Sequence, residues 1–108
     1  MKEKNDYGFY SGGYIFDRLD RTALRAIRKQ YGLSPATQLY TANATITFMH
    51  QLCDIKKSRC FVGDIEVMGD GSYQISVRLH QAQTCIASAT FWFKKAKHNY
   101  CEIQGEKE

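Results

Sequence analysis

The chain has 108 residues, of which 44% are hydrophobic and 24% are charged, and its formal net charge is +4. This length is typical of one domain, and the composition is that of a globular protein rather than a disordered one. No apolar stretch approaches the ~20 residues that cross a bilayer, and no hydrophobic run follows the first residues as in a signal peptide. We therefore expect a single cytoplasmic domain over residues 1–108, with a polar tail from about residue 95 and no membrane contact.

Residues from about 14 to 29 predict an amphipathic helix, preceded by a Gly-Gly pair and followed by Gly32. Four apolar residues recur at the spacing of one helical face, and arginines occupy the other side. The apolar residues are Ile15, Leu19, Ala23 and Ala26, and the arginines are Arg18, Arg21, Arg25 and Arg28. Asp17 interrupts this basic stripe and no nucleic-acid motif accompanies it, so we expect no nucleic-acid partner.

After the helix the hydrophobic period changes from that of a helix to two, which predicts strands. The expected strands cover residues 40–48, 59–68, 73–80 and 85–93. In the first, we expect Thr41 on the polar face, because it alternates with apolar residues on both sides. The tripeptide Gly69-Asp70-Gly71 predicts a tight hairpin between the second and third strands.

One helix followed by an antiparallel meander predicts an α+β fold in which a curled sheet wraps around the helix. A sheet with one apolar face must cover that face, and this helix is the candidate to do so. One helix cannot cover a whole sheet of this size, so we expect dimerisation to complete the packing.

The four cysteines form no Cys-x-x-Cys pair, which predicts reduced thiols rather than a metal site or a redox motif. We therefore expect no metal site.

Asp20 stands out because a helical wheel places it on the margin of the apolar face, near Phe16, Leu24 and Ile27. A carboxylate in such surroundings costs free energy unless it is paired. Two interpretations fit this position. Asp20 is either a partly buried acid satisfied by a neighbouring hydroxyl or amide, or a functional carboxylate.

The pair Gly12-Gly13 also has two interpretations. It is either a helix junction whose backbone conformation side chains would obstruct, or an exposed pair of backbone amides that holds an anion or a developing oxyanion. An acid seven residues after the second glycine, on the same helix, favours the second interpretation.

The segment from Asn5 to Asp20 resembles the signature of hotdog-fold acyl-CoA thioesterases of the phenylacetate-degradation (PaaI-like) type. That signature is Asn-x-x-Gly-x-x-His-Gly-Gly, followed by a helix with an acid seven residues after the second glycine. This chain has Asn-Asp-Tyr-Gly-Phe-Tyr-Ser-Gly-Gly and then Asp20. Residues 45–48 and 69–72 are also similar to the family's strand end and central hairpin.

The resemblance implies a thioesterase that hydrolyses an acyl-CoA, or a related acyl-carrier thioester, to a free acid and a thiol. Asp20 would be the nucleophile or general base, and the Gly12 N–H would polarise the thioester carbonyl. Asn5 would orient the attacking water or the leaving thiolate. Thr41 would match a hydroxyl residue that assists from the partner subunit. The acid and the oxyanion donor would come from different subunits of a homodimer or a dimer of dimers.

Substrate contacts would involve Ser11 and Gly13 beside the oxyanion donor. The basic residues Lys56, Lys57 and Arg59 would hold the phosphates of coenzyme A. No cofactor is implied, since coenzyme A enters as part of the substrate and leaves as product.

The sequence departs from the family pattern at Ser11, where the family has His. In the family a full strand also precedes the Asn, whereas four residues precede Asn5 here. The alternative function is therefore a shortened, non-catalytic hotdog module that binds an acyl thioester or a protein partner.

Overall fold

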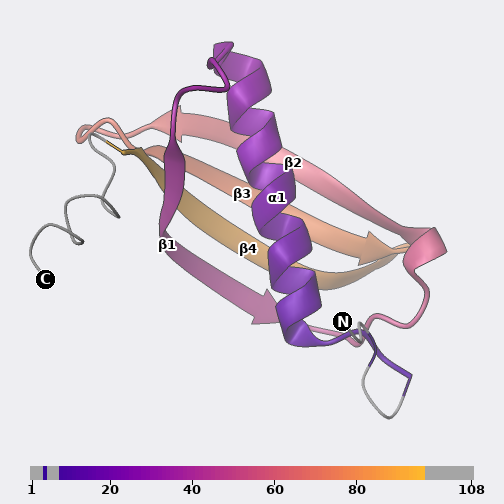
Figure 1. The fold of residues 1–108 in the computed structure, drawn as a ribbon. Coiled ribbons are helices and arrows are strands. Elements are labelled where there is room, and N and C mark those ends of the chain that lie inside the picture. Colours follow the sequence, from indigo (N-terminus) through magenta and orange to yellow (C-terminus); the bar gives the residue numbers. More distant parts are fainter. Residues whose placement is uncertain (1–3, 5–7, 97–108) are drawn as a thin grey trace, which may run out of the picture.

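The computed structural model describes residue 4 and residues 8–96, so Asn5 lies outside the described residues. One long helix packs across one face of a four-stranded antiparallel sheet (Figure 1). In chain order the elements are α1 (Gly12–Tyr31), β1 (Leu39–Phe48), the short 3-10 helix η1 (Ile55–Lys57), β2 (Ser58–Val67), β3 (Tyr73–Gln81) and β4 (Thr84–Lys95). The expected α+β architecture is confirmed.

The helix is two residues longer at each end than the hydrophobic pattern predicts, because both ends are capped. The Ser11 side chain accepts a hydrogen bond from the Tyr14 N–H at 3.1 Å, which satisfies one of the unpaired donors of the first turn. Gly32 ends the helix in the left-handed conformation (φ 58°), where a side chain would be strained, and its N–H bonds to the Arg28 carbonyl.

The helix buries a row of side chains against the sheet. These side chains are Ile15, Leu19, Ala23 and Ile27, at a spacing of four residues. Ile27 rather than the expected Ala26 completes the row. Burying each large member contributes about 1.5–3 kcal/mol, so this row fixes the rotation of the helix about its axis.

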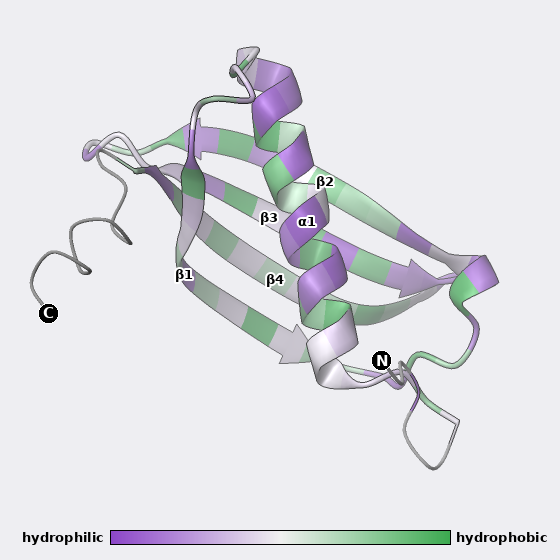
Figure 2. Ribbon diagram, in the orientation of Figure 1, coloured by the Kyte–Doolittle hydropathy of each residue, from purple (hydrophilic) through white to green (hydrophobic). Residues whose placement is uncertain are grey.

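The sheet has the strand order β1-β4-β3-β2, which places β1 and β2 at opposite edges. The β2–β3 and β3–β4 connections are tight antiparallel turns, and the hairpin expected at Gly69-Asp70-Gly71 is present. Figure 2 shows apolar and polar residues alternating along the strands, as expected for a sheet with one covered face. The central strands supply most of the core, chiefly through Ile75, Val77, Leu79, Phe91 and Phe93.

A β-bulge at Ala42 divides β1 into two parts, and the strand bends there (Figure 1). Thr41 pairs with Phe93, whereas Asn43 pairs with Trp92, so Ala42 is an extra residue in the ladder. Because the side-chain period of a strand is two, one extra residue moves all later side chains to the other face. The prediction that Thr41 lies on the polar face is therefore wrong: it shares the helix-facing side with Ala44.

Two other differences from the sequence-based expectations lie at strand ends. β4 continues to Lys95, two residues beyond its expected end, and Lys94 and Lys95 pair with Tyr40 and Leu39. β3 and β4 each include one more residue at their shared turn than the pattern predicts. In the part of the chain that the structure describes, no helix is long and apolar enough to cross a membrane.

Candidate functional site

Asp20 and Thr41 meet where the helix faces the edge strand β1. The Thr41 hydroxyl donates a hydrogen bond to Asp20 Oδ1 at 2.7 Å. This contact exists only because of the bulge at Ala42, which turns Thr41 toward the helix. Asp20 is half-buried and Thr41 is exposed, so the pair stands at the border between the core and solvent.

The hydrogen bond gives Asp20 a defined orientation and leaves its second oxygen available. Among the described residues, Asp20 makes no ion pair and no other hydrogen bond. By contrast, Asp17 on the exposed side of the same helix is paired with Arg21 at 3.0 Å, as their i, i+4 spacing predicts. An oriented carboxylate with one free oxygen can act as a general base or as a nucleophile.

Gly12 and Gly13 form the first turn of the helix, and both are exposed. Neither of their N–H groups has an acceptor in the described part of the chain. These free donors lie at the positive end of the helix dipole, which favours a negatively charged or polarised oxygen. The Ser11 side chain accepts the Tyr14 N–H and acts as the helix cap.

Phe48, at the end of β1, packs over Gly12. A Cβ atom on Gly12 would lie 3.3 Å from the tip of the Phe48 ring, so glycine permits this close approach. Phe48 and Gly12 line a hollow of about 200 Å³, together with Tyr10 and Ile15. Phe48 is 48% exposed, and its ring forms an apolar wall beside the free amides.

Asp20 and the Gly12 N–H of one chain cannot reach the same carbonyl group. They are eight residues apart on one straight helix, which separates them by about 12 Å along its axis. A reacting carbonyl needs a donor and a base each within about 3 Å. One chain thus presents two half-sites, an acid in the middle of the helix and free amides at its start.

The three basic residues expected to hold phosphates lie away from Asp20. Lys56 and Lys57 are exposed on η1, and Arg59 is exposed on β2, at the sheet edge opposite β1. Within one chain the structure does not bring them to the Asp20–Thr41 pair. No group of three or more His, Cys, Asp or Glu side chains that could hold a metal ion occurs within the described residues.

Two features of this site were not predicted. The Asp20–Thr41 contact depends on a bulge, and an alternating sequence carries no signal for the extra residue. Phe48 could be assigned to the apolar face of its strand, but its packing on Gly12 depends on how the strand end meets the helix start. Neither the glycine at the start of the helix nor the aromatic residue at the end of the strand gives a sign of that contact in the sequence.

Comparison with solved structures identifies the fold. A conserved protein of Pseudomonas aeruginosa superposes with a TM-score of 0.71 at 20% identity, over 89% of this chain and 75% of that chain. A Bacillus halodurans protein solved with CoA gives 0.73 at 16% identity, over 90% of this chain and 62% of that one. A Ralstonia eutropha protein, named as a phenylacetic acid degradation-related thioesterase, gives 0.68 at 20% identity, over 87% of this chain and 67% of that one.

The chain has the hotdog fold. This confirms the fold that the Asn5–Asp20 signature implied. No protein-family model matches the sequence, and no curated protein matches it either. The hotdog helix is α1, and the sheet that curls around it is β1-β4-β3-β2.

Proposed function

We propose that this hotdog protein hydrolyses an acyl-CoA or a related acyl thioester, with Asp20 as general base or nucleophile. The observation that carries the proposal is the half-buried Asp20 carboxylate, oriented by Thr41 at 2.7 Å and otherwise unpaired among the described residues. A base on the margin of an apolar core can act on a thioester while bulk water is largely excluded.

The Gly12 N–H is the proposed oxyanion donor. Attack on the thioester carbon places negative charge on the carbonyl oxygen, and a free amide at a helix start stabilises that charge. The Gly13 N–H and Ser11 border the same position, and Asn5 is proposed to orient the attacking water or the leaving thiolate. Lys56, Lys57 and Arg59 remain the proposed phosphate contacts.

The site is proposed to form between two subunits. The separation of about 12 Å between the two half-sites of one helix requires a second copy to supply the missing group. In a two-fold dimer, the acid of one helix and the amide of the other can meet twice, once on each side of the axis.

Coenzyme A derivatives are the proposed substrates. The neighbour from Bacillus halodurans was solved with CoA, and a Streptococcus mutans protein of 23% identity was solved with acetyl CoA, with a TM-score of 0.61. Carrier-protein thioesters share the phosphopantetheine arm and belong to the same proposed class.

The test is thiol release from a panel of short, medium, long and aromatic acyl-CoAs. Wild type should release thiol, and Asp20→Asn should lower the rate by about 100-fold or more, because a positioned general base contributes 10²–10⁴-fold. Asparagine keeps the shape and can still accept the Thr41 hydrogen bond. Asp64→Asn, an exposed acid on β2, is the matched control and should retain full turnover. Equal rates in wild type and Asp20→Asn would exclude the assigned role.

The second candidate is a non-catalytic module that binds acyl thioesters. It is favoured by Ser11, whose side chain caps the helix at the position where the family has His. This candidate predicts that acyl-CoA raises the melting temperature through mass action while no thiol is released. Thiol release by wild type but not by Asp20→Asn would favour the enzyme over the binding module.

A further inference from the structure

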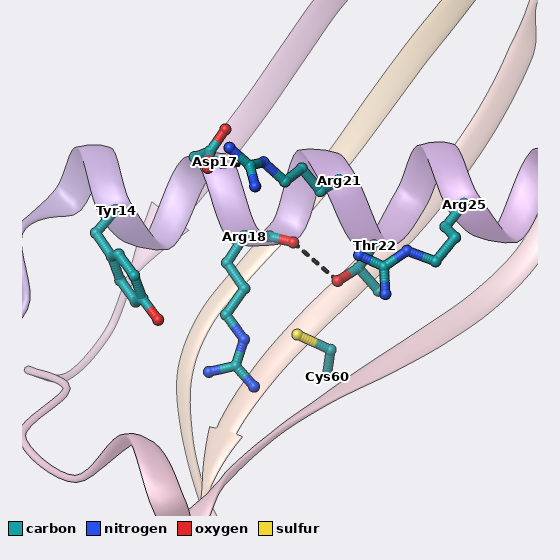
Figure 3. A pocket seen from close by; sticks show the side chains of 7 residues that line it. All are labelled: Tyr14, Asp17, Arg18, Arg21, Thr22, Arg25 and Cys60. Atoms are coloured by element: carbon teal, nitrogen blue, oxygen red, sulfur yellow. Dashed lines mark hydrogen bonds and ion pairs between the residues drawn. The ribbon is translucent and has the colours of Figure 1, made fainter.

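A second hollow lies between α1 and the other edge of the sheet. It has a volume of about 450 Å³, which is within the range of small-molecule sites. Figure 3 shows the side chains that line it: Tyr14 and Arg18 extend from the helix on the side of Cys60, whereas Asp17 and Arg21 lie along the helix, away from Cys60. The lining residues are Tyr14, Asp17, Arg18, Arg21, Thr22, Arg25 and Cys60.

The helix places its basic residues on this side by their spacing. Arg18 and Arg25 are seven residues apart, within about 20° of two full turns, so they face the same way about 10 Å apart. Thr22 lies between them, and its hydroxyl donates to the Arg18 carbonyl at 2.8 Å. The floor on the strand side is the half-buried Cys60.

The three arginines are held to different degrees. Arg18 is fixed at the start of β2, where its guanidinium donates to the Ser58 hydroxyl at 2.5 Å. Arg21 is paired with Asp17 at 3.0 Å, which neutralises one charge. Arg25 makes no hydrogen bond or ion pair with any described residue. The hollow therefore carries two uncompensated positive charges, one fixed in place and one free to bind.

We propose that this hollow binds a small organic phosphate ester. A phosphate monoester carries a charge of about −1.5 to −2 at pH 7, which balances two arginines. Guanidinium groups match phosphate oxygens with paired hydrogen bonds, and the volume accommodates a nucleoside-sized body as well as the phosphate.

This site is distinct from the one around Asp20. Asp20 contacts Thr41 on β1, whereas Arg18 contacts Ser58 on β2, and these strands are the two opposite edges of the sheet. The helix lies between the two sites. The proposal does not depend on thioester hydrolysis.

Calorimetric titration with adenosine 5′-monophosphate tests the proposal, with adenosine as the uncharged counterpart. The monophosphate should bind and adenosine should not. Arg25→Gln should weaken binding of the monophosphate by at least tenfold, because it removes a charged hydrogen-bond donor to the phosphate oxygens. Arg25 is exposed and makes no hydrogen bond or ion pair with a described residue, so we expect this variant to retain the fold. Lys29→Gln removes the same charge one turn further along the helix and should leave binding unchanged.

Alkylation provides a second readout that locates the ligand. Adenosine 5′-monophosphate should slow the reaction of Cys60 with iodoacetamide. Peptide mass spectrometry measures the rate of this reaction. Cys53, which is exposed and contacts Gln81 outside the hollow, should react at an unchanged rate. Binding should also be unaffected in Asp20→Asn. Absence of binding at millimolar concentration, equal affinity in Arg25→Gln, or an unprotected Cys60 would each overturn the proposal.

Discussion

Among the described residues, only the Thr41 side chain makes a hydrogen bond to Asp20. What this hydrogen bond contributes depends on the role of the carboxylate. If the role of Asp20 is structural, the hydrogen bond contributes about 1 kcal/mol to the free energy of folding. If Asp20 acts on a substrate, the same bond holds the reacting oxygen in line, and its loss appears in turnover. A substitution at Thr41 therefore separates the two interpretations of Asp20 that the sequence left open.

We expect Thr41→Val to lower kcat for thioester hydrolysis by about tenfold with little change in KM, since a hydrogen bond to a charged group is worth about 1.5–3 kcal/mol. Thr41→Ser keeps the hydroxyl and should restore most of the turnover. Thr45→Val, on the same strand but on the opposite face, is the matched control. An unchanged kcat in Thr41→Val would show that the contact with Asp20 has a structural role and not a catalytic one.

At the scale of elements, the turn between β2 and β3 contains the one described carboxyl whose pKa is clearly shifted. The pKa of Asp70 is lowered, first by a hydrogen bond from the Ser72 hydroxyl at 2.6 Å and then by the Ser72 N–H at 2.9 Å. Both bonds favour the ionised carboxylate. They close the turn that joins the two strands, so the charge of Asp70 and the hairpin geometry are linked.

The sign of the pH dependence follows from that linkage. A carboxyl with a lowered folded-state pKa stabilises the protein above its unfolded-state pKa, and the stabilisation is lost as the pH falls through the folded-state value. Ser72→Ala should raise the Asp70 pKa toward its ordinary value, as measured by NMR titration of the side-chain carboxyl carbon. Ser76→Ala, on the neighbouring strand β3, should leave it unchanged. An unaltered Asp70 titration in Ser72→Ala would contradict the assigned cause.

The elements themselves could be predicted because their hydrophobic periods are strong. The helix, the four strands and the hairpin at Gly69-Asp70-Gly71 all follow from local sequence. What local sequence could not predict was the bulge at Ala42, since bulges depend on how a whole strand pairs with its neighbour. The acid and the free amides of the site were predictable from the helix, but the face of Thr41 was not.

At the scale of the whole molecule, both edges of the sheet carry exposed apolar side chains. Phe48 and Met49 lie at the end of β1, and Val62 and Val67 lie on β2, all at least 43% exposed. Unpaired edges with apolar residues favour association with another chain. The β1 edge adjoins Asp20, and the Gly12 amide lies under Phe48, so a partner there would meet both half-sites.

Two inactive variants can show whether the site is shared between subunits. Gly12→Pro removes the proposed oxyanion donor, and proline is well tolerated at the first position of a helix. The Phe48 ring tip has to move by a few tenths of an ångström to admit the new Cβ atom. We expect Gly12→Pro and Asp20→Asn homodimers to be folded and each to have little activity.

A mixed dimer of these two variants contains one site with both lesions and one site with none. Random exchange of an equal mixture makes half of the dimers mixed, so activity should return to about a quarter of the wild-type level. Light scattering establishes the dimer, and circular dichroism establishes that each variant is folded. If each site were built within one chain, every site in the mixture would carry one lesion, and no activity would return. Recovery of activity on mixing would therefore mean that Asp20 of one subunit acts together with the Gly12 N–H of the other, because the two groups of one chain lie about 12 Å apart.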